Sequence, residues 1–516
     1  MRRREFVGAM TGAGLDRSAP PPAGAAGQPN LLILMSDQHN PHVLGCRGDS
    51  VVKTPHLDAL AASGVSFENT YCQAPICVPA RMSFLTGQQP SRSRVWHNTD
   101  ILPSDVPTFA HGLGAAGYET VLVGRMHFEG VDQWHGFEKL LVGNITPIYP
   151  HIPHTLPKRL LIGAQGGSRA AVELAGPGST TYQAHDEQVA AATAKFLMER
   201  PRTGGRPFCA VAGFVLPHSP YICSRRDWNH YYDRVALPEI PPGYFERLHP
   251  AVTLWRKNRG IEDLPPETIR RARAAYYGLV THFDRLVGTV MSALRNSGLD
   301  RNTIVIYTSD HGDMAGENGM WWKNSFYEGS VTVPLMVSFP GTFPSGAKVR
   351  EIVSLVDVGP TLLELAGARP LPNADGTSLV PLLRGEQVRW ANEAFSEFPP
   401  FMGSPAMRMV RSGRWKLNHY ESHRPQLFDL EADPHEYNDL GESRRHAAIR
   451  TQLHGRALEN WPVEEMKRLL AERARDRAVM NRWAAAVKPP APQRWQPPPG
   501  ANVFPEPSGR GEGREP

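Results

Sequence analysis

Residues 31–35 read Leu-Leu-Ile-Leu-Met, and the next three residues are Ser36-Asp37-Gln38. A short continuous apolar run of this kind is typical of a strand that is buried on both faces of a sheet. A second such run, Thr-Ile-Val-Ile-Tyr at residues 303–307, leads into Ser309-Asp310-His311-Gly312. In open α/β sheets, sites form beyond the carboxyl ends of the strands. We therefore expect the two acidic turns to share one site.

Other β and α signals lie between these two runs. Strands are expected at residues 120–123 and 209–215, and apolar residues recur at helical spacing from residue 268 to residue 296. Strands that alternate with helices indicate a parallel arrangement. The sequence therefore predicts an α/β fold with a large mixed, mostly parallel sheet flanked by helices.

The character of the sequence changes after about residue 385. Three short strand-like pieces, at residues 407–410, 415–417 and 426–429, predict a small antiparallel sheet there. A charged helical stretch follows from about residue 442 to residue 487. We divide the chain into a leader (1–28), a main α/β domain (29–384), a smaller C-terminal α+β region (385–487) and a proline-rich tail (488–516). The tail is expected to be extended, either as an ordered arm or as a disordered end.

The composition is that of a globular protein and narrows the class of partner. The chain has 516 residues, 41% of them hydrophobic and 21% charged, with a formal net charge of +5. That charge is small for the length and does not indicate nucleic-acid binding, because local arginine clusters fit a solvated helix face. No run of 18 or more apolar residues occurs, so no membrane span is expected.

The N-terminus and the cysteines are the parts of the sequence that inform on the cellular location of the protein. Arg3-Arg4-x-Phe6-Val7 resembles a twin-arginine export signal, but the apolar stretch behind it is short and rich in glycine. A cytoplasmic and a periplasmic location both remain open. Five scattered cysteines are too few for a disulfide framework, and their odd number leaves at least one unpaired.

One cysteine stands in a specific pattern. Residues 77–81 read Cys-Val-Pro-Ala-Arg. A Cys followed by Pro two residues on and Arg four residues on is the pattern at which type I sulfatases have their cysteine oxidised to formylglycine. The alternative interpretation is a buried Cys before a turn Pro and a surface Arg, and so short a match does not by itself decide between them.

Asp37, Asp310 and His311 offer two carboxylates and an imidazole at strand ends. Such oxygen-rich ligand sets suit hard cations, namely Ca²⁺, Mg²⁺ or Mn²⁺, and the histidine favours Mn²⁺ more than an all-oxygen site would. Gln38 adds an amide oxygen. The alternative is that residues 310–313 form an ordinary polar turn, and the presence of Asp37 and Cys77 argues against it.

The chain resembles the type I, formylglycine-dependent sulfatases of the alkaline phosphatase superfamily, from about Pro29 to Leu440. Besides the runs quoted above, the shared motifs are Thr54-Pro-His-Leu-Asp58, Thr86-Gly87, Pro90-Ser-Arg92, Gly124-Arg-Met-His127, Pro217-His218-Ser-Pro-Tyr221, Ser309-Asp-His-Gly-Asp313, Lys323 within Gly319-Met-Trp-Trp-Lys323, Val333-Pro334 and Leu427-Phe-Asp429. Their number and order make the resemblance specific. It implies an alkaline phosphatase-like fold.

The chain departs from the common pattern at three positions. Arg125 stands where many sulfatases have Lys, Gln38 stands where many have a second Asp, and Ala80 stands where Ser is common. Arginine is planar and bulkier than lysine, so the first change is not neutral. With residues 124–128 and 132–137, these features resemble the branch of the choline sulfatases and phosphonate monoester hydrolases.

The resemblance implies a role for each candidate residue. It implies that formylglycine made from Cys77 is the nucleophile and that one divalent ion, Ca²⁺, Mn²⁺ or Mg²⁺, is held by Asp37, Gln38, Cys77, Asp310 and His311. Arg81 would stabilise the oxyanion of the nucleophile, and His127 would be the base that releases sulfate. The implied sulfate and leaving-group residues are His218 and Lys323, and the implied substrate-binding residues are Asn98 and Arg125.

These roles predict a hydrolase that cleaves the sulfate monoester of a small substrate. The same machinery would serve a phosphonate monoester hydrolase or a phosphodiesterase. A third alternative is a catalytically inactive binding protein, in which Cys77 stays a thiol because no formylglycine-generating or equivalent maturation enzyme acts on it. Trp134, Trp321 and Trp322 are candidates for an aromatic wall around a cationic or aryl group, with core packing as the alternative. The substrate and a homo-oligomeric state are left open.

Overall fold

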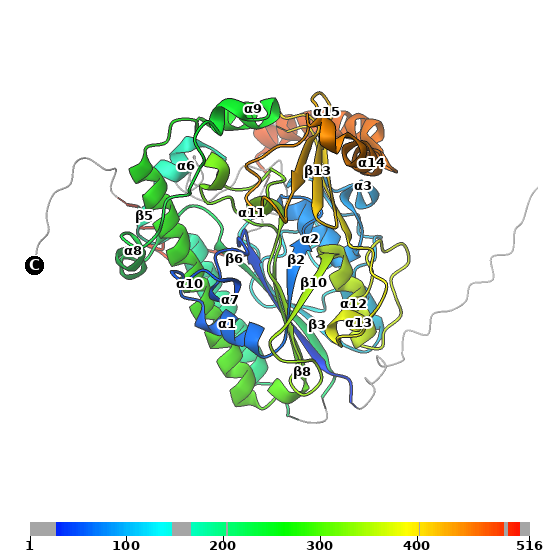
Figure 1. Ribbon diagram of the computed structural model, residues 1–516. Helices are drawn as coiled ribbons and strands as arrows, with labels where there is room; N and C mark the ends of the chain where they lie inside the picture. The colour runs from blue at the N-terminus through cyan, green and yellow to red at the C-terminus, as the bar shows by residue number, and fades with distance from the viewer. Residues whose placement is uncertain (1–26, 147–166, 203–204, 402, 490–493, 506–516) are drawn as a thin grey trace, which may run out of the picture.

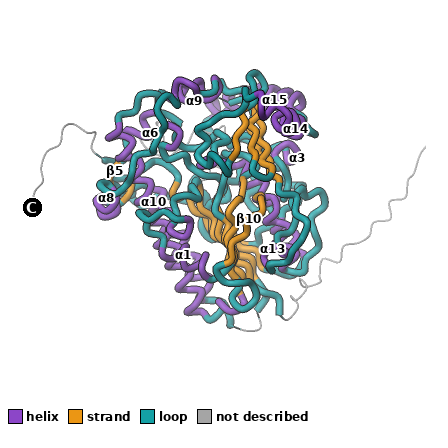
Figure 2. The backbone as a smooth tube through the Cα atoms, viewed as in Figure 1, coloured by secondary structure: helices purple, strands orange, loops and turns teal. Residues whose placement is uncertain are grey.

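The computed structural model describes residues 27–146, 167–202, 205–401, 403–489 and 494–505. Within these residues, one large sheet forms the centre and helices cover both of its faces (Figures 1 and 2). A smaller sheet and two helices from the C-terminal part lie beyond one end of it. The expected leader, residues 1–28, lies almost wholly outside the described part of the chain.

The central sheet has eight strands in the order β10-β2-β9-β8-β1-β6-β3-β4. Only β9 runs antiparallel to its neighbours, β2 and β8. The predicted mixed, mostly parallel sheet is therefore confirmed. The strands are β1 (Asn30–Asp37), β2 (Val65–Tyr71), β3 (Glu119–Gly124), β4 (Lys139–Leu140), β6 (Phe208–Pro217), β8 (Thr303–Ser309), β9 (Leu335–Ser338) and β10 (Ala347–Ser354).

Strand β1 shows why the sheet needs helices on both faces. All of its residues are buried. Leu32 and Leu34 belong to one hydrophobic core and Leu31, Ile33 and Met35 to the other, because successive side chains of a strand point to opposite faces. A continuous apolar run is the sequence consequence of this two-sided burial.

Each core is closed by its own set of helices. One core contains side chains of α1, α7 and α10, and the other contains side chains of α2, α4 and α12. The helices of the main domain are α1 (Pro55–Ala62), α2 (Cys77–Thr86), α3 (Pro90–Ser93), α4 (Phe109–Ala115), α6 (Arg169–Glu173), α7 (Thr181–Met198), α8 (Arg225–Tyr231), α9 (Pro250–Arg259), α10 (Pro266–Ser297), α11 (Glu328–Val331), α12 (Val358–Leu365) and α13 (Val380–Leu383).

The long helix α10 follows directly from its sequence. It begins with Pro266 and ends before Gly298, which takes a φ of 73°. Proline tolerates the first helical turn, and glycine accepts the left-handed conformation at a helix end. Its apolar stripe packs on the sheet, so the helix expected over residues 268–296 is confirmed.

The C-terminal part forms a four-stranded antiparallel sheet, as predicted, with one strand more than expected. Its strands are β11 (Glu393–Phe398), β12 (Met407–Ser412), β13 (Trp415–Tyr420) and β14 (Gln426–Asp429), followed by α14 (Ala447–Leu458) and α15 (Val463–Val487). The buried Lys416 ties this sheet to the main domain, because its Nζ donates to the carbonyl of Phe326 and to Glu328, each at 2.7 Å. The boundary placed at residue 384 stays a prediction.

Residues 494–505 of the expected tail return to the main domain. Val503 exchanges backbone hydrogen bonds with Ser179, at 2.9 and 3.0 Å. The short pair β5 (Gly176–Pro177) and β7 (Ile222–Cys223) lies next to this contact. The tail is thus an arm on the main domain over the residues that can be described. Among the described helices, none combines the length and hydropathy that a membrane span requires.

Candidate active site

The site lies where β1 and β8 end side by side. The two strands pair in parallel, with Ser36 opposite Ser309, so Asp37 and Asp310 emerge at the same edge of the sheet. Helix α2 begins at Cys77 beside them. The expectation that two acidic turns share one site therefore holds.

Four side chains from three parts of the chain meet at this edge. Asp37, Cys77, Asp310 and His311 are buried, and one ligand atom from each lies within 4.8 Å of the others. His311 Nε2 is 3.3 Å from Cys77 Sγ and 3.6 Å from Asp310 Oδ1. The arrangement gathers two carboxylates, an imidazole and a sulfur around one point.

The orientation of these groups suits a divalent cation. Arg81 donates from Nε to Asp310 Oδ2 at 2.8 Å and from a terminal nitrogen to Asp37 Oδ2 at 3.0 Å. These bonds leave Asp37 Oδ1 directed at the centre. Asp310 Oδ1 also faces the centre, where it accepts from the backbone of Gln38 at 3.1 Å and of His311 at 2.9 Å. His311 donates from Nδ1 to the carbonyl of Gly312 at 3.0 Å, so its Nε2 presents a lone pair to the same centre. Two carboxylate oxygens and one imidazole nitrogen form a donor set for Mn²⁺, Mg²⁺ or Ca²⁺.

The charges of this cluster are unequal. Burial and Cys77 act to raise the pKa of Asp37, but Arg125 and Arg81 outweigh them and hold it well below its usual range. Burial raises the pKa of Asp310, although Arg81 opposes it. Burial would lower the pKa of His311, but Asp310 reverses this and raises it. Asp37 is therefore the most firmly ionised of the three groups.

Arg81 is committed to the carboxylates. It is fully buried, and besides its two ion pairs it donates to the carbonyl of Arg125 at 2.9 Å. Helix α2 carries it there because Cys77 and Arg81 stand one helical turn apart. The pairing of Arg81 with the nucleophile stays a prediction, and its observed contacts orient Asp37 and Asp310.

Cys77 occupies the first position of α2 and faces cations. Lys323 Nζ donates to its Sγ at 3.1 Å. Burial alone would raise the pKa of Cys77, but Lys323 and His311 hold it well below its usual range. Asn98 accepts a hydrogen bond from the backbone of Val78 at 2.9 Å, which fixes the start of the helix. These contacts favour the thiolate, the reactive form of cysteine, in an unmodified Cys77.

Lys323 joins three other predicted residues. Its ammonium group donates to Gln38 Oε1 and to His218 Nε2, each at 2.8 Å, in addition to Cys77. His218 donates from Nδ1 to the carbonyl of Ser219, so its Nε2 accepts. Gln38 therefore directs its amide oxygen to Lys323, and its role as a metal ligand stays a prediction.

Arg125 and His127 form the other wall of the site. Arg125 donates to Asp37 Oδ2 at 2.8 Å and to His127 Nδ1 at 2.7 Å. Burial and Arg125 lower the pKa of His127 to about 4. The loop fits here because residue 213 of β6 is glycine, where a Cβ would lie 1.9 Å from the carbonyl oxygen of Arg125.

Two site residues lacked an assigned role in the sequence analysis. Glu129 is 6% exposed, its Oε1 lies 3.6 Å from His127 Nε2, and burial raises its pKa to about 8. A single Glu in a loop carries no pattern that would have identified it. Asp313, which stands in a quoted motif, accepts hydrogen bonds from Gln38 at 2.6 Å and from Tyr221 at 2.7 Å. It orders the polar side of the site.

The three tryptophans proposed for an aromatic wall separate into two groups. Trp321 and Trp322 are 1% and 2% exposed and belong to a hydrophobic core. Trp134 is 49% exposed on the surface. For the first two, core packing, the alternative role, is confirmed.

The comparisons with known proteins agree on one family. The profile of the Sulfatase family matches residues 29–368, and that of the N-sulphoglucosamine sulphohydrolase C-terminal region matches residues 316–461. A choline-sulfatase from Rhizobium meliloti (strain 1021) is 36% identical over 431 residues, which cover 81% of this chain and 83% of the relative. Arylsulfatase K from Danio rerio is 30% identical over 442 residues and covers 80% of each chain.

Solved structures agree with the fold. A phosphonate monoester hydrolase from Silicibacter pomeroyi is similar with a TM-score of 0.68 and 27% identity, over 87% of this chain and 96% of the other. A phosphonate monoester hydrolase from Agrobacterium radiobacter gives a TM-score of 0.71 over the same shares, at 24% identity. The second likeness is one of fold alone.

Proposed function

Since this chain belongs to the sulfatase family of hydrolases, we propose that it cleaves the sulfate monoester of a small substrate with a formylglycine formed from Cys77 and one divalent metal ion. The observation that carries the proposal is the setting of Cys77. Its sulfur lies within hydrogen-bond reach of His311 and Lys323, at the buried end of two parallel strands. Contacts of a buried sulfur with two cationic or polar side chains support a chemical role for Cys77.

The formylglycine and the metal ion would each supply one kind of chemistry. A hydrated aldehyde at position 77 offers two hydroxyls on one carbon, one to attack sulfur and one whose deprotonation expels sulfate. A divalent ion held by Asp37, Asp310 and His311 would polarise the sulfuryl oxygens. Arg81 keeps both carboxylates in place for that ion.

Lys323 and His218 are placed to neutralise the sulfate and the departing oxygen. Both side chains lie on the Cys77 side of the cluster, and the ammonium group of Lys323 contacts the imidazole of His218 directly. A preorganised cation strengthens its interaction as negative charge develops on the leaving oxygen. His218 or Lys323 would then give that oxygen a proton, and His127 would be the base for the second step. Because Arg125 donates to Nδ1 of the neutral ring, that hydrogen bond would have to open before His127 accepts a proton there.

Lys323→Ala and His218→Ala are each expected to lower kcat/KM for a sulfate monoester by roughly 10²-fold or more, because each removes a group that acts on the developing charge. Steady-state kinetics of the formylglycine-containing enzyme measure this. Lys348→Ala, an exposed lysine of β10 with 60% side-chain exposure, is the matched control. A loss confined to the melting temperature, with kinetics intact, would assign both residues a structural role.

The second candidate function keeps the machinery and changes the ester. The similarity to a phosphonate monoester hydrolase at 27% identity favours it, and a monoanionic phosphodiester resembles a sulfate monoester in charge and shape. The test is a comparison of kcat/KM for an aryl sulfate, choline sulfate, a phosphodiester and a phosphonate monoester. A clear preference for either sulfate supports the first proposal, and a preference for a phosphorus ester supports the second.

A further inference from the structure

We infer that the alcohol portion of the substrate carries an anionic group, such as a carboxylate or a second sulfate, and that Arg494 binds it. Arg494 begins the C-terminal arm, by which we mean residues 494–505. The inference rests on the proposed function, because it assigns a cavity beside His127 to the alcohol that is released from sulfur.

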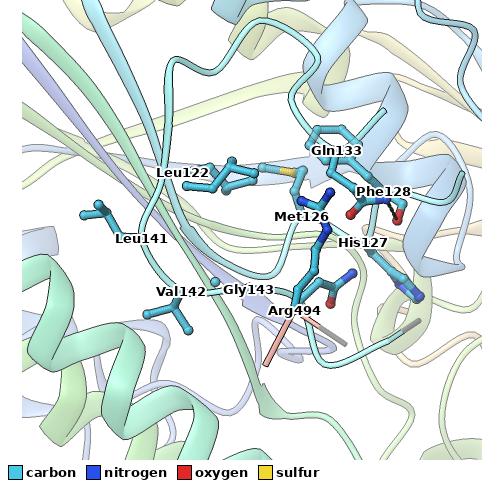
Figure 3. Close-up of a pocket in the computed structure, with 12 residues that line it drawn as sticks. Leu122, Met126, His127, Phe128, Gln133, Leu141, Val142, Gly143 and Arg494 are labelled. Atoms are coloured by element: carbon cyan, nitrogen blue, oxygen red, sulfur yellow. Dashed lines mark hydrogen bonds between the residues drawn. The ribbon is translucent and has the colours of Figure 1, made fainter. Parts of the chain in front are cut away.

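The cavity borders the loop that carries the catalytic residues. It has a volume of about 250 Å³ and is lined by Gly124, the last residue of β3, and by Met126 and His127 in the loop that follows. Figure 3 shows the Arg494 side chain extending from the arm toward Met126, on the side where His127 lies. A group bound there is therefore next to the reacting centre. The apolar part of the wall consists of Leu122, Met126, Phe128, Leu140, Leu141 and Val142.

The described residues that line this cavity give it a positive charge. Among the described residues that line it, Arg494 is the only one with a permanently charged side chain, and no carboxylate is among them. The described part of the chain offers the Arg494 guanidinium no hydrogen bond or ion pair. The nearby Asp132 is held by its own loop, because it accepts from the backbone of Trp134 at 2.9 Å and of His135 at 3.2 Å. Within the described residues, the guanidinium therefore interacts with Asp132 only through the electrostatic field and keeps its N–H donors for a ligand.

Asn144 supplies a second observation that points to a ligand. Its side chain is 7% exposed and lines the cavity. Its Nδ2 donates to Thr146 at 2.8 Å, but its buried Oδ1 has no hydrogen-bond partner within the described residues. A buried acceptor without a donor is costly, and a hydroxyl of a bound alcohol would satisfy it. The cavity therefore suits a hydroxylated or aromatic body with an anionic substituent.

The C-terminal arm holds Arg494 in place by a fitted contact. A Cβ at Gly143 would lie 2.2 Å from the carbonyl oxygen of Arg494, so the arm lies directly on a position that only glycine allows. The next residue, Trp495, is 8% exposed, and its Nε1 donates to Gln188 at 2.9 Å. Its ring packs edge-on against His185 with centroids 5.1 Å apart. The start of the arm is therefore anchored on both sides of its backbone.

The far end of the arm is anchored as well. Besides the Ser179–Val503 pairing, the backbone of Thr181 donates to Asn502 Oδ1 at 2.8 Å. Ser179 Oγ donates to the carbonyl of Ala501 at 3.1 Å. Such a strap presents Arg494 as a fixed part of the cavity wall. Fixing the backbone of Arg494 beforehand lowers the entropy that ligand binding must overcome.

The positive charge of Arg494 favours substrates whose alcohol portion is anionic over those whose alcohol portion is cationic. A carboxylate or sulfate can accept charge-assisted hydrogen bonds from the planar guanidinium, in a two-point geometry. A quaternary ammonium such as choline would meet a like charge at the same place. The choline-sulfatase relative is therefore a guide to the reaction and not to the alcohol that this enzyme takes.

The experiment compares two aryl sulfates that differ by one carboxylate on the ring. The measured quantity is the ratio of kcat/KM for the carboxylated and the uncharged ester, in the wild type, Arg494→Gln and Arg494→Lys. We expect the ratio to fall about 10-fold to 100-fold in Arg494→Gln, because a charge-assisted hydrogen bond is lost, and to be largely kept in Arg494→Lys. Arg482→Gln removes an exposed arginine of α15 that does not line the cavity, and is the matched control.

Calorimetric binding of the two free phenols, which needs no turnover, separates this inference from the proposed function. Wild type should bind the carboxylated phenol more tightly than the uncharged one, and Arg494→Gln should lose the difference. If no sulfate is hydrolysed but this difference is found, only the proposed function fails. If both the rate ratio and the binding difference are the same in Arg494→Gln as in Arg482→Gln, the inference is overturned.

Discussion

Cys77→Ser is expected to lower turnover of a sulfate monoester by roughly 10³-fold or more relative to the formylglycine form, which is the scale of losing a covalent nucleophile. A hydrated aldehyde has two hydroxyls on one carbon and serine has one. Serine can still attack sulfur beside Lys323 and His311, but it has no second hydroxyl with which to expel sulfate. We therefore expect a sulfated enzyme to accumulate in the variant.

Mass spectrometry of the peptide that spans residue 77 measures both parts of this prediction. In active wild type the peptide should be about 18 Da lighter than its thiol form, or close to the thiol mass when the aldehyde is hydrated. Wild type made without a maturation enzyme should keep the thiol and show little activity. Cys46→Ser, at a half-buried cysteine away from the cluster, should behave as wild type.

Equal turnover from the aldehyde, thiol and serine forms would remove the central claim of the proposed mechanism. It would also leave the setting of Cys77 without a purpose. If Cys77 is modified but no sulfate ester is hydrolysed, the result would instead support the second candidate function, hydrolysis of a phosphorus ester.

Asp310→Asn is expected to weaken binding of a divalent ion and to lower kcat by roughly 10²-fold or more, with a small change in melting temperature. The amide keeps the shape of the side chain, but it removes a negative charge from the donor set. Stripping divalent ions from the wild type should have the same effect on activity. Calorimetric titration with Mn²⁺ and Ca²⁺, together with kinetics after chelation, measures both effects.

Asp233→Asn is the control for that variant, because Asp233 is exposed and lies outside the buried group of four. The assignment fails if the Asp310 variant binds the ion as the wild type does. It also fails if activity is complete in the presence of excess chelator.

Four of the eight strands of the large sheet, β1, β3, β6 and β8, could be predicted because each has a local apolar pattern, whereas β2, β4, β9 and β10 were not predicted. Residues 31–35 and 304–307 are apolar without a break, as expected of strands that are covered on both faces. Strand β11 (Glu393–Phe398) escaped prediction because its sequence, Glu-Ala-Phe-Ser-Glu-Phe, neither alternates regularly nor forms a continuous apolar run, and its place is decided by pairing with β12. Pairing across strands is not visible in a local pattern.

The sequence was enough to predict which residues meet at the candidate site, but not which hydrogen bonds and ion pairs they make with one another. Parallel strand ends must meet at one edge, so Asp37 and Asp310 could be placed together. The commitment of Arg81 to those carboxylates could not be predicted, because it depends on the direction of one side chain within the core. The same holds for the contact of Arg494 with the cavity, which joins two parts of the chain that share no pattern.

The burial of Cys77 also limits when a modifying enzyme can reach its thiol. Its side chain is 1% exposed, and the residues that enclose it, His311 and Lys323, follow it by 234 and 246 residues. Chains grow at roughly 5–20 residues per second, so the ribosome needs on the order of 10 to 50 s to make that stretch. During this interval residue 77 has been synthesised while the walls of its site have not. An enzyme that must reach the thiol would have its access then, on the nascent chain, and the folded protein would offer it none without opening α2.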